Sequence, residues 1–251
     1  MDSVSPKKYL GQHFLKDENI ARKIVSSLVS DVQNVLEVGP GMGVLTKSLI
    51  LREFKDLRVA EIDKESVIYL NNHFPGLQVI AGDFLKLDLA SLFTGKFAII
   101  GNFPYNISSQ IFFKVLEHRD LVTEVVGMIQ KEVAERIAAP PGSKTYGILS
   151  VLLQAWYKID YLFTVNENVF IPPPKVKSAV IRFTRNTTDQ LECDEKFFFN
   201  LVKTAFNQRR KTMRNAIRSL CPEGFNHPYL DKRAEQLSVA EFVELALSIK
   251  Q

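Results

Sequence analysis

The sequence predicts an α/β protein in which an open, largely parallel sheet is followed by a small helical C-terminal domain. Two observations indicate this. Short apolar segments alternate with helical patterns up to about residue 185, as in successive βαβ units. After a polar break at 186–189, only helical patterns follow. We therefore expect two domains, residues 1–186 and residues 187–251.

The individual elements follow from apolar runs of strand length and from apolar stripes of helical period, each ended by glycine, proline or polar residues. Strands are predicted at 34–38, 57–63, 77–83, 97–100, 124–129, 161–165 and 178–183. Helices are predicted at 20–30, with Asp17 or Asn19 as its cap, and at 44–51, 108–117, 131–138, 146–156, 199–220 and 239–250.

Composition excludes several classes of protein. The chain has 251 residues, of which 46% are hydrophobic and 24% charged, so it can bury a substantial core. Cys193 and Cys221 have neither disulfide nor metal-ligand spacing, and we expect reduced thiols and no metal. The N-terminus lacks the apolar core of a signal peptide, and no apolar run reaches the ~20 residues of a membrane span. We expect a cytoplasmic protein with no membrane partner.

A glycine loop follows the first predicted strand. Gly39, Gly41 and Gly43 lie between this strand and a helix, as in the βα turn of Rossmann-like nucleotide-binding folds. The dinucleotide fingerprint needs its third glycine one position later, where Val44 stands, which disfavours an NAD-dependent oxidoreductase. Taken alone, the loop is equally compatible with a tight turn.

Acidic residues end the next two strands. Glu61 follows Gly39 by roughly twenty residues, the spacing of an acid that binds ribose hydroxyls, and Asp63 is the alternative. Asp83 could accept a hydrogen bond from an adenine amine, although such a residue is more often a helix cap.

The fourth strand ends in Asn102, Phe103, Pro104 and Tyr105. The Asn102 side-chain oxygen and a nearby backbone carbonyl can both accept from an exocyclic amine, Pro104 fixes that backbone, and Tyr105 offers a ring on which a base can stack. Two acceptors that bind one amine orient its lone pair, and neither acceptor needs to be charged. An ordinary strand-to-helix turn would use the same residue types.

Four strand ends thus carry Gly39, Glu61, Asp83 and Asn102. In an open α/β sheet, ligands bind at the carboxyl ends of the strands. This coincidence is more specific than any single member, and it predicts a site for S-adenosylmethionine beside a site for an acceptor amine.

Two further segments allow two interpretations each. The leader at 7–15 is either a frayed tail or, as Phe14 and Leu15 favour, docked onto the domain; its His13 alone would more often be structural. The segment at 170–176 contains three prolines, so it is either a linker or a rigid wall that presents Phe170 to a flipped base.

The C-terminal domain contains a basic segment. Between Lys203 and Arg218 there are six basic residues and no acidic one, and we expect them to bind RNA phosphates rather than to form a merely solvated face. These residues are Lys203, Arg209, Arg210, Lys211, Arg214 and Arg218.

Together these segments resemble the ribosomal RNA adenine dimethyltransferases of the KsgA (RsmA) family over nearly the whole chain. The resemblance rests on LGQHFL (10–15), EVGPGMGVLT (37–46), EID (61–63), GD (82–83), NFPYNIS (102–108), QKEVAERI (130–137), FIPPPKVKSAV (170–180) and FNQRRKTMRN (206–215). Two positions depart from the family pattern: many members have Asn where His13 stands, and Leu is commoner than Phe103.

The resemblance implies a class I methyltransferase fold and a monomeric enzyme. It implies S-adenosylmethionine as cofactor, held by His13, Leu15, Gly39, Gly41, Glu61, Asp83 and Asn102. Asn102 and Pro104 would hold the target amine, and Tyr105 with Phe170 would sandwich the adenine. The implied substrate is a pair of adjacent adenosines near the 3′ end of small-subunit rRNA, in the immature subunit, during ribosome biogenesis.

Two rival functions remain at this point. A related enzyme class dimethylates adenine in large-subunit rRNA, although FIPPPKV and QRRKTMRN look more like the small-subunit type. A non-catalytic assembly factor on the same fold is the other, and the intact glycine loop, Glu61 and NFPY count against lost catalysis.

Overall fold

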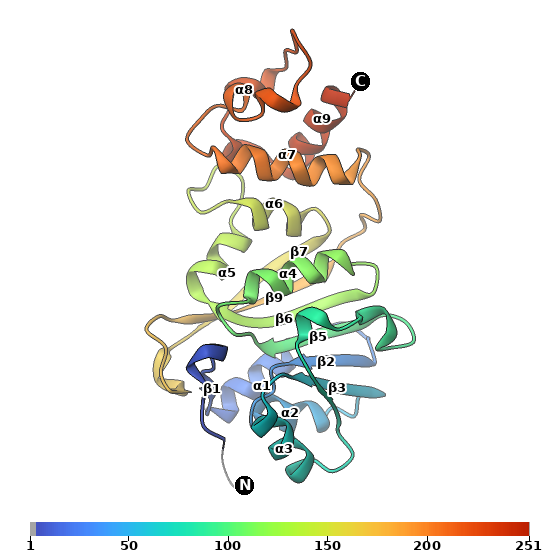
Figure 1. The fold of residues 1–251 in the computed structure, drawn as a ribbon, viewed down its shortest axis with the longest axis vertical. Coiled ribbons are helices and arrows are strands. Elements are labelled where there is room, and N and C mark those ends of the chain that lie inside the picture. The colour runs from blue at the N-terminus through green and yellow to red at the C-terminus, as the bar shows by residue number, and fades with distance from the viewer. Residues whose placement is uncertain (1–3, 251) are drawn as a thin grey trace. The chain divides into compact units, whose positions relative to one another are not determined.

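The computed structural model describes residues 4–250. The chain forms two compact units (Figure 1). The first comprises the residues up to 134 together with 160–185, and the second comprises 135–159 together with the residues from 186 onward. Among the described residues, no helix combines the length and the apolar character that a membrane crossing would require.

A seven-stranded sheet in the order β4-β3-β2-β5-β6-β9-β7 organises the fold. Its strands are β2 (Asn34–Val38), β3 (Asp56–Glu61), β4 (Gln78–Ala81), β5 (Phe97–Asn102), β6 (Val122–Gln130), β7 (Tyr157–Val165) and β9 (Ser178–Arg185). The five strands from β4 to β6 pair in parallel, and β9 runs antiparallel to β6. The predicted α/β class, with an open and largely parallel sheet, is confirmed.

Crossover helices join the parallel strands, as the alternating pattern predicted. They are α2 (Val44–Ile50), α3 (Lys64–His73) and α4 (Ser108–Glu117), while α1 (Glu18–Ser26) precedes β2. Helix α1 begins at Asp17, whose carboxylate accepts from the backbone N–H groups of Asn19 and Ile20, so Asp17 is the cap. It ends at Ser26, earlier than the predicted residue 30.

The leader is docked onto the first unit. Its strand β1 (Phe14–Leu15) pairs antiparallel with β8 (Phe170–Ile171), which lies in the proline-rich segment. Leu15 and Phe170 are both buried in one hydrophobic cluster with residues of α1, β2 and β6. The leader therefore reaches the carboxyl ends of the strands as part of the fold.

Helices α6 (Ile148–Gln154), α7 (Glu195–Asn207), α8 (Met213–Ala216) and α9 (Val239–Lys250) belong to the second unit, while α5 (Lys131–Ala138) spans the boundary between the units. The sequence predicts that 135–159 belongs to the first domain, whereas in the structure this segment groups with the residues from 186 onward. The Gln154 side chain instead donates to the carbonyls of Ile137 and Ala139, and Trp156 packs on Phe198 at the start of α7. The Gln154 hydrogen bonds hold 135–159 together, and the contact between Trp156 and Phe198 joins this segment to the second unit.

The predicted continuous helix at 199–220 is wrong. Helix α7 ends at Asn207 and α8 begins at Met213. Phe206 is buried, and a helix that continued past it would need apolar residues three and four positions later. Those positions hold Arg209 and Arg210 instead. The chain therefore turns at 208–212 and exposes the cations.

Candidate functional site

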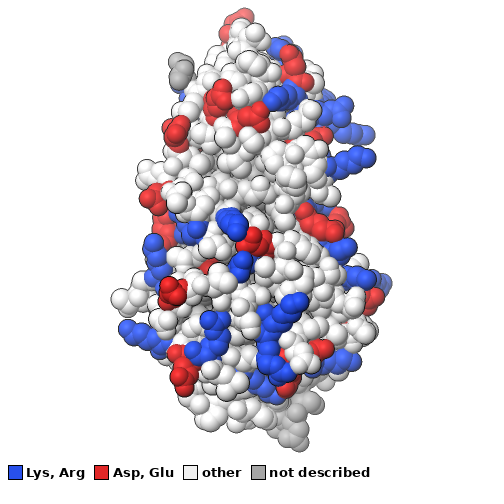
Figure 2. All heavy atoms as spheres, turned by 180° about the vertical axis from the view of Figure 1, so that it is seen from behind, with Lys and Arg blue, Asp and Glu red and all other residues white. Residues whose placement is uncertain are grey.

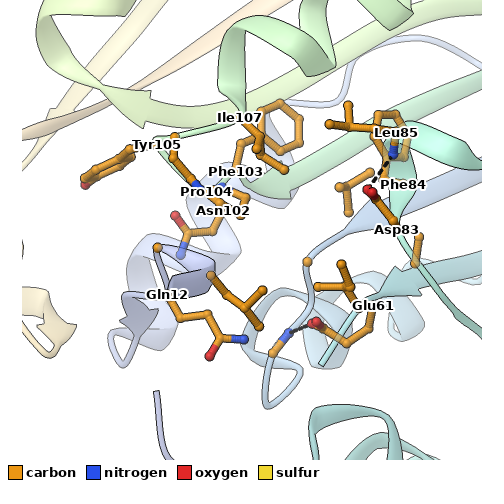
Figure 3. A pocket seen from close by; sticks show the side chains of 18 of the residues that line it. Gln12, Glu61, Asp83, Phe84, Leu85, Asn102, Phe103, Pro104, Tyr105 and Ile107 are labelled. Atoms are coloured by element: carbon orange, nitrogen blue, oxygen red, sulfur yellow. Dashed lines mark hydrogen bonds between the residues drawn. The ribbon is translucent and has the colours of Figure 1, made fainter. Parts of the chain in front are cut away.

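A cavity of about 180 Å³ lies at the carboxyl ends of β2, β3, β4 and β5 in the first unit (Figure 3). The four strand ends that the sequence singled out all reach it. Its lining includes eight of the predicted site residues: His13, Gly39, Gly41, Glu61, Asp83, Asn102, Pro104 and Tyr105. The parallel register of neighbouring strands brings these distant positions together.

Glu61 is a buried acceptor held by the backbone on both sides. One carboxylate oxygen accepts from the Gly41 N–H at 3.0 Å, and the other accepts from the Asp63 N–H at 2.9 Å. Burial raises the Glu61 pKa, which these two hydrogen bonds counteract. A carboxylate can accept about four hydrogen bonds, so Glu61 retains capacity for a diol.

Asp63 is not free to bind a ligand. It is 3% exposed, caps α3, and forms an ion pair with Lys7 of the leader. Burial favours its neutral form, but the hydrogen bonds from Lys7 and Ser66 lower the Asp63 pKa overall. Of the two acids left open by the sequence, Glu61 therefore faces the cavity and Asp63 secures the leader.

Asp83 caps a short turn and also lines the cavity. Its Oδ1 accepts from the Leu85 N–H at 3.0 Å and so caps a short 3₁₀ turn. Its Oδ2 accepts from no described residue, and the side chain lines the cavity. One oxygen is thus available to a ligand amine.

The glycine loop brings backbone close to the cavity. Gly39 and Gly41 have φ values of 69° and 56°, which disfavour any residue with a side chain. A Cβ on Gly41 would stand 2.8 Å from the ring of Phe14 in the leader. The loop and the leader therefore fit together only because this position has no side chain.

Asn102 is oriented by the leader. Its Nδ2 donates to the backbone carbonyl of His13 at 2.8 Å, which leaves Oδ1 as the acceptor available at the cavity. The Pro104 carbonyl accepts from the Ile107 N–H at 3.2 Å and has a second lone pair. The site thus presents two uncharged acceptors at the predicted acceptor position.

Tyr105 is held on two sides. Its hydroxyl lies 2.6 Å from the buried Ser178 hydroxyl, and its ring stacks on His13 with 5.6 Å between centroids. The His13 Nδ1 donates to the Pro172 carbonyl at 2.7 Å. Burial raises the Tyr105 pKa, so the phenol stays neutral. His13 therefore stacks on one face of Tyr105, and Tyr105 lines the cavity.

Two predicted residues lie elsewhere. Phe170 is 2% exposed and packs in the hydrophobic core, so the structure does not present its ring to the cavity, and its contact with a base stays a prediction. The reason is the β1–β8 pairing, which turns Phe170 inward and leaves Ile171 exposed. Leu15 is also buried and lines a separate cavity of about 30 Å³ beside Glu37 and Asn102.

Several lining residues were not predicted as site residues. Gln12 accepts from the Lys7 N–H at 2.8 Å and orders the leader. Apolar walls come from Ile62, Phe84, Leu85 and Ile107. The signal was present in the sequence, because Ile62 and Phe84 directly follow the two strand-end acids.

The predicted RNA-binding residues all belong to the second unit. Two of them have acidic partners there: Arg214 pairs with Asp231 at 3.0 Å and Arg209 with Glu235 at 3.8 Å. Arg210, Lys211 and Arg218 are exposed and have no ion-pair partner among the described residues. The absence of acids within the segment therefore did not mean that all of its cations are uncompensated.

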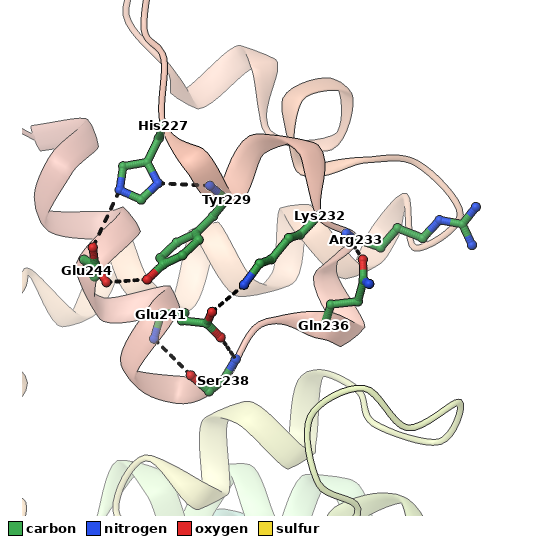
Figure 4. Close-up of polar contacts among 8 residues, drawn as sticks. All are labelled: His227, Tyr229, Lys232, Arg233, Gln236, Ser238, Glu241 and Glu244. Atoms are coloured by element: carbon green, nitrogen blue, oxygen red, sulfur yellow. Dashed lines mark hydrogen bonds and ion pairs between the residues drawn. The ribbon is translucent and has the colours of Figure 1, made fainter.

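Acidic residues further along the second unit are also paired. Lys232 contacts Glu241 at 2.6 Å, and the Tyr229 hydroxyl donates to Glu244 at 2.6 Å (Figure 4). On the face shown in Figure 2, cationic and anionic side chains are interspersed. Within residues 4–250, no group of three or more His, Cys, Asp or Glu side chains is placed to hold a metal ion.

An open α/β sheet with a glycine loop and three polar strand ends around one cavity defines a Rossmann-like class I methyltransferase. The chain belongs to the ribosomal RNA adenine dimethylase family, whose model matches residues 4–251. The predicted family and enzyme class are therefore confirmed.

Named relatives and solved structures agree with this assignment. Two relatives are named ribosomal RNA small subunit methyltransferase A. The one from Parabacteroides distasonis is 61% identical over 98% of this chain and 95% of its own length. The one from Cytophaga hutchinsonii is 59% identical over 98% of this chain and 97% of its own length. A dimethyladenosine transferase from Plasmodium falciparum superposes with a TM-score of 0.77 at 26% identity, covering 95% of this chain and 98% of its own. The 23S rRNA methyltransferase ErmE superposes with a TM-score of 0.68 at 25% identity, covering 95% and 100%.

Proposed function

We propose that the protein transfers methyl groups from S-adenosylmethionine to the exocyclic amines of two adjacent adenosines near the 3′ end of small-subunit rRNA, within the immature subunit. The observation that carries the proposal is the cavity that joins Glu61 and Asp83 to the oriented amide of Asn102. One ligand-binding edge thereby serves both a nucleoside donor and an amine acceptor.

The residues present fit the cofactor. Glu61 has spare acceptor capacity for ribose hydroxyls, and Asp83 Oδ2 can accept from the adenine amine. Ile62 and Leu85 supply apolar walls for the base, and the glycine loop admits backbone where a side chain would block the approach. When bound, the sulfonium supplies the methyl group and the leaving-group driving force.

The acceptor side works by orientation. Asn102 Oδ1 and the Pro104 carbonyl would both accept from the adenosine N6 amine, which draws its lone pair out of conjugation with the ring. Tyr105 would stack on the base, held in place by Ser178 and His13. Positioning of reacting atoms in this way contributes several powers of ten to rates. Neither acceptor carries charge, which suits an amine that stays neutral until it reacts.

Small-subunit rRNA is favoured over large-subunit rRNA by the relatives. Those named for the small subunit are 54–61% identical to this chain, whereas ErmE is 25% identical. The basic residues of the second unit would add RNA affinity without sequence specificity. Since the cavity retains every polar group that the reaction needs, a purely non-catalytic assembly role is disfavoured.

Primer extension on rRNA from a strain that lacks the protein tests this proposal. Dimethylated adenosine blocks reverse transcriptase, so the wild-type strain should give a strong stop near the 3′ end of the small-subunit rRNA. The mutant should lose this stop and no other. A stop that disappears from large-subunit rRNA instead would assign the enzyme to the rival class.

A further inference from the structure

The leader exposes an aromatic ring at the rim of the cavity. Tyr9 is 77% exposed, yet it lines the same cavity as Asn102 and Tyr105. Its neighbour Lys8 is exposed as well. A tyrosine ring that is so exposed contributes little to the stability of the fold. Its position at the rim of the cavity instead suits contact with a ligand.

The turn that carries Tyr9 is fixed at both ends. On one side, Lys7 pairs with Asp63 and Glu65 at the start of α3. On the other, Gly11 has a φ of 66°, and a Cβ there would stand 2.7 Å from Oδ1 of Asn106, the residue after Tyr105. The short 3₁₀ turn Lys8–Leu10 is closed by the Gly11 N–H, which donates to the Lys8 carbonyl at 3.0 Å. The ring therefore stands on a preformed support that loses little entropy on binding.

Two flat ligands could use this ring: the adenine of the cofactor or a base of the RNA. Apolar walls beside Glu61 and Asp83 already come from Ile62, Phe84 and Leu85, which surround the place where the cofactor base fits. Tyr9 differs from these residues because it is exposed and adjoins an exposed lysine. A ring next to a cation is the combination that binds single-stranded nucleic acid, the ring by stacking and the cation at a phosphate.

We propose that Tyr9 is a stacking platform for a base that flanks the target adenosine in the substrate RNA, and that Lys8 binds a phosphate of the same strand. This inference rests on the proposed function, since it assumes an RNA strand that enters the cavity with one adenosine extruded. It extends RNA recognition by the first unit beyond the target adenosine, whereas the sequence predicts phosphate contacts only in the C-terminal domain.

Four variants test the inference: Tyr9→Ala, Tyr9→Trp, Lys8→Ala and, as a matched control, Leu51→Ala. Leu51 is 80% exposed in the same unit but does not line the cavity. For each variant we would measure binding of immature small subunits at several salt concentrations and, separately, S-adenosylmethionine affinity by calorimetry.

Tyr9→Ala should weaken subunit binding by about 5- to 150-fold, the range for loss of one base stack, while S-adenosylmethionine affinity stays unchanged. Tyr9→Trp should retain binding, and Leu51→Ala should match the wild type. Lys8→Ala should flatten the salt dependence by about 0.7, whereas Tyr9→Ala should leave its slope intact, because stacking releases no counterion.

Three results would overturn the inference. A loss of S-adenosylmethionine affinity in Tyr9→Ala with unchanged subunit binding would mean that the ring covers the cofactor. Equal losses of both would mean that the leader turn, not the ring, is needed. No change in either would leave the ring without a ligand. If the wild type binds subunits but transfers no methyl group to them, the proposed function fails, and the role of Tyr9 is still decided by the binding data.

Discussion

The cavity of the first unit and the basic segment of the second unit differ in how their polar side chains are held. Those of the cavity are fixed by hydrogen bonds, whereas several in the basic segment are exposed to solvent. In the cavity, the polar side chains at two strand ends are fixed by backbone groups: Glu61 by Gly41 and Asp63, and Asn102 by His13. In the basic segment, Arg210, Lys211 and Arg218 are exposed cations. Orienting an amine requires fixed acceptors, whereas attraction to phosphate requires only charge near the RNA backbone. The comparison therefore predicts that mutations in the first region impair chemistry and that mutations in the second impair binding.

The largest effect is expected at Asn102. Asn102→Ala removes the one side-chain acceptor proposed for the target amine and should lower turnover by about 10²-fold or more, with the fold intact. Single-turnover methylation of small subunits measures it, and Leu51→Ala serves as the control for an exposed change in the same unit. Near-normal turnover in Asn102→Ala would remove the proposed acceptor site.

A substitution of Glu61 should weaken binding of the cofactor and leave binding of the RNA unchanged. Glu61→Ala removes charge-assisted hydrogen bonds worth about 1.5–3 kcal/mol, so S-adenosylmethionine affinity should fall by roughly 10- to 150-fold. Glu61→Gln keeps one acceptor oxygen and should lose less. Calorimetry with both variants decides the point, and an unchanged dissociation constant would move the ribose contact away from Glu61.

The basic segment offers an internal control of its own. Replacing the unpaired Arg210 and Arg218 with Gln should weaken subunit binding and flatten its salt dependence by about 0.7–0.9 for each phosphate that is no longer neutralised. The same change at Arg209 and Arg214, whose charges already face Glu235 and Asp231, should have the smaller effect. S-adenosylmethionine affinity should not change in either double variant. If both variants bind subunits as well as the wild type at every salt concentration, the basic segment is only a solvated face and does not bind RNA.

The last effect concerns the stability of the fold near the cavity and not turnover or binding. Glu37 is 1% exposed, and burial raises its pKa from the ordinary 4.5 to about 8, partly offset by a 2.6 Å hydrogen bond from Thr46. Because the folded protein holds this proton more tightly than the unfolded chain does, the stability it contributes is complete below pH 4.5 and is lost as pH rises toward 8.

Glu37→Gln keeps a neutral side chain at every pH and should therefore flatten this dependence. Each unit of pKa elevation corresponds to about 1.4 kcal/mol at most, so the variant should gain stability at pH 8 relative to the wild type and gain little at pH 4.5. Denaturant unfolding at both pH values measures the difference. Parallel pH profiles for the two proteins would show that Glu37 is ionised in the folded state.

The strand ends could be predicted from the sequence because each depends on local signals. An apolar run followed by glycine or an acid marks a strand end, and a parallel sheet then gathers all such ends on one edge. Gly39, Glu61, Asp83 and Asn102 were found in this way. The direction of the Asn102 amide was not predictable, since it is set by the His13 carbonyl, which comes from a different part of the chain.

Two of the differences between the sequence predictions and the structure also have non-local causes. Whether Phe170 or Ile171 faces inward depends on pairing with Phe14 and Leu15, far away in the sequence, because successive residues of a strand point to opposite faces. The charge balance of the basic segment depends on Asp231 and Glu235, which follow the segment in the sequence. A search for acids within the segment could not detect them.

The most direct test of the central claim is a reconstituted reaction with labelled S-adenosylmethionine and ribosomal subunits from a strain that lacks the enzyme. Digestion of each rRNA, followed by mass spectrometry, identifies the modified nucleosides and their positions. The proposed function predicts two adjacent N6,N6-dimethyladenosines near the 3′ end of the small-subunit rRNA, formed by the wild type and not by Asn102→Ala. Dimethyladenosine in large-subunit rRNA, or equal product from Asn102→Ala, would contradict it.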